Sequence, residues 1–361
     1  MSSTFARGAL GVALFATACG QAPTAPNVSP SGFALPGVLR SDADASSPLE
    51  VRALAGRFTN ILTGAAAPGV TLSIEGLGAV AGDAAGQFSL ESEAPDGIYR
   101  ITASGAGLVS RVTTLTFPGQ APVISLIPST FNMTAFDQMA RHFGEPDGVT
   151  KRWTVPPALV IETSLVDAQS VIGGIPQYPP VASAQQLSEA SINELLASLN
   201  RALPLMTGGA YPAFSSIGRS TTEPGGNIEM DRPATITVVR YAGLDQLCKG
   251  YTYFLYDTLT LEALSSRLFM QTCSSVAGAA PLSAVVAHEL GHALGYAHVS
   301  ATPSVMAATV FSDVTDFDRQ VGAIVFQRPP GNRAADVDPE VSVNAAPARV
   351  GGRTRVVGPI Q

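Results

Sequence analysis

Three of the four histidines in the chain lie close together, at positions 288, 292 and 298. His288 and His292 are four residues apart, so on a helix both imidazoles leave the same face, one turn apart. Their nitrogens could bind one Zn²⁺ at about 2.0–2.1 Å. Glu289 follows the first histidine and is expected to lie to one side of the metal, where its carboxylate can reach a water on the zinc.

Gly295 is expected to end this helix, because glycine tolerates the left-handed conformation common at helix ends. The chain can then turn back and bring His298 to the metal as a third ligand. Three protein ligands leave a fourth position for water, which is typical of catalytic zinc. Zinc would lower the pKa of that water toward ~7, and Glu289 would take its proton as a general base. The alternative is an apolar core helix whose histidines are only hydrogen-bonded.

The pattern HExxHxxGxxH resembles the zinc-binding motif of the metzincin endopeptidases. Metzincins also carry a methionine turn, and Met306 follows the last histidine at a spacing similar to that of the matrixins. The resemblance implies that Met306 forms an apolar floor under the three imidazoles and is not a ligand. No tyrosine follows Met306, so the tyrosine ligand of astacin-like and serralysin-like members is not expected.

The segments that must position this motif alternate between strand and helix patterns. Strands are predicted at residues 158–163, 234–241, 251–257 and 267–272. An amphipathic helix is predicted between the first two of them, at residues 183–206. The zinc helix is expected to begin near Pro281 or Leu282. Thr315 or Asp316 is expected to cap a final helix that runs through Phe326.

The metzincin resemblance implies an arrangement for these elements. The strand 251–257 would lie antiparallel at the sheet edge, beside the strand 267–272. Its free edge above the zinc could take an extended peptide as a further strand. The expected catalytic domain spans residues 129–332 and has a twisted mixed sheet with long helices.

Residues 51–128 show short alternating strands separated by Gly, Asp and Pro, a pattern that predicts a β-sandwich. The run from Ala67 to Gly107 resembles the carboxypeptidase regulatory-like domain, a seven-stranded accessory module. The expected fold class is therefore α+β, with an N-terminal β-sandwich followed by the metzincin-like catalytic domain. Residues 333–361 are rich in Ala, Val, Pro and Arg and are expected to form a loosely ordered tail.

The N-terminus has the pattern of an export signal, with Arg7 before an apolar run that ends at Ala18. The residues before Cys19 resemble a bacterial lipoprotein box, which implies that residues 1–18 are removed and that Cys19 is lipidated. Residues 19–50 would then be a flexible tether. The alternatives are an ordinary cleaved secretory signal and an uncleaved anchor, although the apolar run is short for a membrane span.

Export would place the mature chain in an oxidising compartment. Besides Cys19 two cysteines remain, and we expect Cys248 and Cys273 to form a disulfide; two buried free thiols are the alternative. The metzincin arrangement would bring them close together, because they flank neighbouring strands. His142 lies far upstream, and we favour an ordinary helix residue over a ligand that occupies the zinc of a zymogen.

The formal net charge is −7 and the chain has only two lysines, so no basic face for nucleic acid is expected. The expected function is an exported zinc-dependent endopeptidase that hydrolyses peptide or protein substrates, with Glu289 as general base. The expected location is the cell membrane or outer membrane through a lipid anchor only, or otherwise the extracellular medium. The alternatives are an inactive cell-surface binding lipoprotein with a zinc-stabilised fold, and hydrolysis of a non-peptide amide. A structural zinc site would have no use for Glu289.

Overall fold

The computed structural model describes residues 51–119, 121–141, 148–167, 170–172, 175–177, 185–229, 231–242, 250–271, 282–308, 312–340 and 354–357. The chain divides into two compact units, Met1–Pro48 and Leu49–Gln361, and the described residues all belong to the second unit. Cys19, Cys248, Cys273 and His142 lie outside the described residues. The disulfide, the lipidation and the tether therefore stay predictions.

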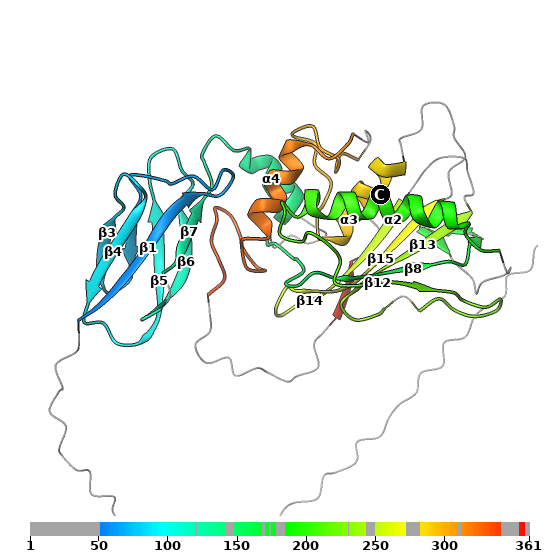
Figure 1. The fold of residues 1–361 in the computed structure, drawn as a ribbon, viewed down its shortest axis with the longest axis horizontal. Helices are drawn as coiled ribbons and strands as arrows, with labels where there is room; N and C mark the ends of the chain where they lie inside the picture. Colours follow the sequence, from blue (N-terminus) through cyan, green and yellow to red (C-terminus); the bar gives the residue numbers. More distant parts are fainter. Residues whose placement is uncertain are drawn as a thin grey trace, which may run out of the picture. The chain divides into compact units, whose positions relative to one another are not determined.

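The N-terminal part contains seven strands in two sheets, which Figure 1 shows in blue to green. The sheet orders are β4-β1-β7 and β3-β2-β5-β6. The strands are β1 (Arg52–Asn60), β2 (Thr71–Ile74), β3 (Gly78–Ala81), β4 (Gln87–Ser92), β5 (Gly97–Ser104), β6 (Arg111–Phe117) and β7 (Val123–Leu126). Alternate residues of both sheets, among them Phe58, Leu72 and Ile101, share one apolar cluster. The β-sandwich and its family resemblance stay predictions.

A second, mixed sheet follows in the order β12-β8-β13-β15-β14-β16, and β9 pairs with β13 beside this path. The strands β12, β8, β13 and β15 are parallel, whereas β14 is antiparallel to β15. A separate hairpin joins β10 to β11. The strands are β8 (Ala158–Glu162), β9 (Val166–Asp167), β10 (Ser170–Ile172), β11 (Ile175–Gln177), β12 (Ile217–Ser220), β13 (Thr235–Ala242), β14 (Gly250–Asp257), β15 (Ala263–Gln271) and β16 (Thr354–Val357).

Two long helices cover one face of this sheet. They are α2 (Glu189–Met206) and α3 (Leu282–Ala293). The described residues also form α1 (Met133–Phe136), which continues as a π-helical turn (Asp137–Arg141), and α4 (Asp316–Val325). Figure 1 shows α2 and α3 over the strands β8, β13 and β15. Inward residues of the helices and of these strands form the largest apolar cluster, which includes Leu195, Leu290 and Val238. The mixed α+β class that the sequence predicts is thus observed.

The edge of the mixed sheet at β14 is only partly free, whereas a free edge was expected. β14 lies antiparallel beside β15, as the resemblance implies, but its other side is not free along its whole length. The strand β16 pairs with Phe254–Asp257 of β14. A peptide added as a further strand would therefore meet a free edge only nearer Gly250, among the described residues.

Residues 333–361 were expected to form a loose tail after α4, but the first of them are fixed by buried ion pairs. Asp336 is fully buried, and both of its carboxylate oxygens accept hydrogen bonds from Arg328, at 2.7 and 2.8 Å. Asp338 forms an ion pair with Arg111 of β6, at 3.0 Å. Composition alone missed this order because it does not show which arginine fixes each carboxylate: Arg328 lies 8 residues before Asp336, and Arg111 lies 227 residues before Asp338.

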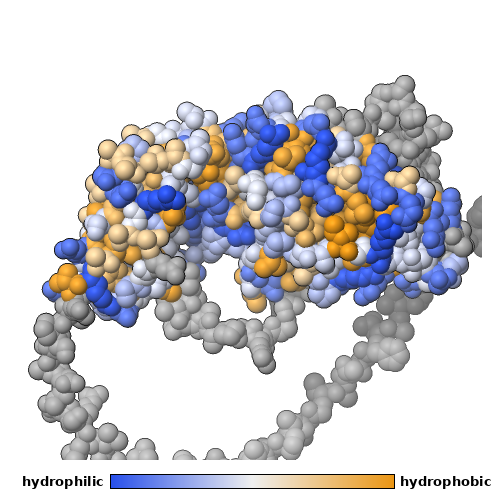
Figure 2. Space-filling view, in the orientation of Figure 1, coloured by the Kyte–Doolittle hydropathy of each residue, from blue (hydrophilic) through white to orange (hydrophobic). Residues whose placement is uncertain are grey.

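No helix among the described residues is long and apolar enough to cross a membrane. On the face seen in Figure 2, hydrophobic residues gather in patches between hydrophilic ones. Exposed large apolar side chains, such as Val123 and Leu259, come from different elements.

Candidate metal centre

The helix α3 is buried along almost its whole length. His288 and His292 are 3% and 0% exposed, and Leu290 on the same helix is fully buried. Its last turn is fixed by Trp153, whose indole Nε1 donates to the carbonyl of Ala293 at 2.7 Å. The two imidazoles are therefore held on a rigid element, as a metal site requires.

Gly295 ends the helix, as the sequence predicts. Its φ is +103°, and its amide donates to the carbonyl of His292 at 3.0 Å. A Cβ at this position would lie 2.2 Å from the backbone oxygen of Lys151, so a side chain has no room there. The turn reverses the chain and leads to His298, which is half-buried.

The structure brings the three histidines together. The Nε2 atoms of His288 and His298 are 3.1 Å apart, those of His292 and His288 3.1 Å, and those of His292 and His298 3.2 Å. Two ligands of a tetrahedral zinc with bonds of 2.0–2.1 Å would be about 3.3 Å apart. The triangle therefore has the size of three of the four corners of a zinc site.

The opposite ring nitrogens fix the orientation of two of these rings. Nδ1 of His288 lies 2.7 Å from the carbonyl oxygen of Val305, and Nδ1 of His292 lies 2.7 Å from that of Tyr296. A carbonyl can only accept, so each Nδ1 carries the proton and each Nε2 presents a lone pair. Such an arrangement of converging lone pairs suits a cation, and backbone carbonyls are common partners of metal-binding histidines. The residues present thus fit zinc.

Burial shifts the pKa values of the three histidines and of Glu289. It lowers the pKa of His288 to about 4 and lowers the pKa values of His292 and His298, and neutral imidazole is the form that binds a metal. Burial also raises the pKa of Glu289 to about 8, against the opposing effect of a hydrogen bond from Thr252. A cation held by the histidines would favour the ionised carboxylate.

Met306 is fully buried and lies against the zinc helix. A Cβ on Gly291 of α3 would be 2.3 Å from its sulfur, so the glycine leaves the space that the methionine fills. The turn that contains Met306 is fixed by the buried carboxylate of Asp318. This carboxylate accepts hydrogen bonds from the amide of Val305 at 3.0 Å and from the hydroxyl of Ser304.

Sequence reasoning missed the part that Asp318 has in this turn. The same carboxylate accepts from the amide of Thr315 at 2.8 Å and completes a capping box at the start of α4. The spacing Thr-x-x-Asp resembles the pattern of such a box and was the available signal. A cap at Thr315 or Asp316 was predicted, and the structure has Thr315 as the cap.

Glu289 is 3% exposed and lies against β14. The hydroxyl of Thr252 donates to its Oε2 at 2.7 Å. A Cβ on Gly250 would lie 2.3–2.4 Å from the Glu289 side chain. Neither residue was singled out from the sequence, because Gly and Thr in a strand carry no pattern that indicates a site.

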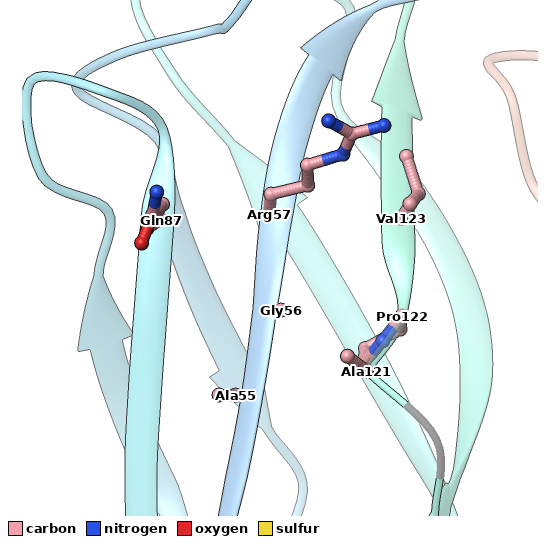
Figure 3. A pocket seen from close by; sticks show the side chains of 7 residues that line it. All are labelled: Ala55, Gly56, Arg57, Gln87, Ala121, Pro122 and Val123. Atoms are coloured by element: carbon pink, nitrogen blue, oxygen red, sulfur yellow. The ribbon is translucent and has the colours of Figure 1, made fainter.

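The N-terminal strands carry a hollow, which is lined by residues of β1, β4 and the start of β7 (Figure 3). Its volume is about 270 Å³, and small or apolar residues such as Gly56 and Pro122 line it together with Arg57. No residue lining this hollow is a histidine, cysteine or carboxylate. Within the described residues, the three histidines are the group that could hold a metal ion.

The comparisons with known proteins agree with this location. Residues 215–321, from just before β12 into α4, match the model of the matrixin family. A search of curated proteins found no match. The matrixin match and the histidine cluster support a zinc metallopeptidase in general, and zinc is the cofactor of this site.

Proposed function

We propose that the chain is an exported zinc-dependent endopeptidase in which His288, His292 and His298 hold the metal and Glu289 is the general base. The observation that carries this proposal is the close triangle of three Nε2 atoms with a buried carboxylate on the same helix. Export, a lipid anchor at Cys19 and the disulfide between Cys248 and Cys273 belong to the proposal from the sequence alone.

The residues divide the chemistry between them. Zinc, when bound, supplies a Lewis acid that polarises the scissile carbonyl and acidifies water. Glu289 takes a proton from the attacking water and passes it to the leaving amine. The carbonyls of Val305 and Tyr296 keep His288 and His292 in the tautomer that presents Nε2. Among the described strands, β16 pairs only with Phe254–Asp257 of β14, and an extended peptide would be aligned by backbone hydrogen bonds along the part of β14 nearer Gly250.

The proposal is tested by comparing the wild type with Glu289→Ala and His292→Ala. We expect the wild type to bind one zinc and to hydrolyse casein or gelatin, and a chelator to stop the hydrolysis. Glu289→Ala should keep the zinc and lose about 100-fold or more in rate, because only the base is missing. His292→Ala should lose zinc as well as activity. Metal content is measured by mass spectrometry and cleavage by a peptide library.

Three outcomes would contradict the proposal. An active Glu289→Ala variant would exclude this residue as the base. If the wild type and Glu289→Ala each bind one zinc and neither cleaves any peptide in the library, the chain is a binding protein with a zinc-stabilised fold. Cleavage of a small amide in a product screen, with no cleavage of peptides, would favour a non-peptide substrate.

A further inference from the structure

On one face of β14, the polar side chain of Thr252 lies in a row of buried residues. Thr252 and Phe254 are both 0% exposed, and Tyr256 on the same face is 2% exposed. The large majority of buried hydroxyls have a hydrogen-bond partner. Thr252 donates to Oε2 of Glu289 at 2.7 Å, and its oxygen also lies 3.1 Å from the backbone carbonyl oxygen of Glu289. Both acceptors that it meets thus belong to one residue of the zinc helix.

The residue two positions earlier on the same face of β14 is Gly250. A Cβ there would lie 2.3 Å from Cγ of Glu289, 2.4 Å from Cδ and 2.4 Å from Oε1. The Glu289 side chain therefore packs directly against the backbone of β14 at Gly250. Gly250 determines where the carboxyl group can lie, and Thr252 determines which of its oxygens the protein holds.

We propose that Thr252 is a positioning residue of the reaction, whose hydroxyl holds Oε2 of Glu289 and keeps the carboxylate in one orientation for proton transfer. This inference rests on the proposed role of Glu289 as the base. A base that can turn away from the attacking water is less effective, since a displacement of about 1 Å can cost on the order of 100-fold in rate. The strand that borders the peptide in the proposed function would also orient the base.

The variants Thr252→Val and Thr252→Ser separate the hydroxyl from the shape of the side chain. Valine keeps the branched shape, so we expect kcat to fall by about 10- to 100-fold with KM changed by less than about twofold and one zinc still bound. Serine keeps the hydroxyl and should restore kcat to within about threefold of the wild type. A purely structural role would not give this split between kcat and KM or this rescue.

Thr237→Val is the matched control. Thr237 is fully buried in β13 of the same sheet, and within the described part of the chain its hydroxyl has no hydrogen-bond partner. Its replacement should leave kcat, KM and zinc content unchanged. A wild-type kcat in Thr252→Val, or a loss of kcat that Thr252→Ser does not restore, would overturn the proposal.

Crystal structures of the zinc-loaded wild type and of Thr252→Val give a test that does not depend on hydrolysis. We expect the Glu289 carboxylate in one orientation in the wild type and in a different or divided orientation in the variant. The same single orientation in both would overturn the positioning role. If the wild type cleaves nothing but the orientation still depends on Thr252, the proposed peptidase function fails and the positioning role stands.

Discussion

At the scale of single residues, the Glu289 carboxylate is surrounded by groups from another element. Glu289 follows a zinc ligand on α3, but its side chain is confined by Gly250 and Thr252 of β14. Burial raises the pKa of Glu289 to about 8 even with the opposing hydrogen bond from Thr252, and this favours the protonated carboxyl at pH 7. The hydroxyl of Thr252 and a cation at the histidines both favour the ionised form that a base needs.

Gly250→Ala tests this confinement. The new Cβ would overlap the Glu289 side chain, so the carboxyl group must move, and we expect at least about a tenfold loss of kcat with zinc still bound. Gly218→Ala in β12 is the control, because its nearest neighbour would be 3.7 Å away. Kinetics and metal analysis on both variants decide the outcome. Equal kcat values for the two would show that the site tolerates a side chain at position 250.

At the scale of elements, the start of α4 and the methionine turn share one carboxylate. Asp318 accepts from the backbone amides of Thr315 and Val305, so the helix cap also fixes the chain just before Met306. Asp318 is fully buried, and hydrogen bonds to a buried charge are stronger than those between neutral groups. The position of the chain just before Met306 therefore depends on the position of α4.

Asp318→Asn should lower the free energy of unfolding by about 2–3 kcal/mol, because an amide nitrogen cannot accept these bonds. It should also weaken zinc binding, since the turn under the histidines loses its anchor. Asp316→Asn is the matched control on the same helix turn, where the side chain is 87% exposed and pairs only with Arg319 in the described residues. Urea denaturation and zinc titration measure both effects. An unchanged zinc affinity in Asp318→Asn would refute the coupling.

At the scale of the whole second unit, buried ion pairs join the N-terminal strands to the segment after α4. Arg328 binds Asp336 and also donates to the carbonyl of Ser125 in β7, at 2.9 Å. Arg111 in β6 binds Asp338. The described part of Leu49–Gln361 therefore shares a buried polar network as well as apolar clusters, and we expect it to unfold in one transition.

Asp336→Asn tests this network. Asparagine tolerates the positive φ of 73° at this position, so the change removes the charge with little added backbone strain. Arg328 would be left buried without its counter-ion, which should cost about 3–5 kcal/mol of stability. Glu340→Gln removes a carboxylate that is 75% exposed and pairs with Arg100, and it should cost less than about 1 kcal/mol. Similar urea midpoints for the two variants would contradict the role of the network.

The sequence by itself predicted the three candidate metal ligands and the course of the helix that carries two of them. The spacing of His288 and His292 and the glycine at 295 act through local backbone geometry, which any helix of this pattern shares. The capping residue Thr315 and the alternating strands were predictable for the same reason. These features depend on neighbours within a few residues, so their physical cause is visible in the residue order.

Only the tertiary structure decided which distant residues hold Glu289 and the segment after α4 in place. Thr252 lies 37 residues before Glu289, and Asp338 lies 227 residues after Arg111, so no local period relates these partners. A threonine in a strand and an aspartate in a tail each have an ordinary local explanation. Their roles arise because packing buries them beside another polar side chain, and most buried polar groups pair with whichever partner the fold places next to them.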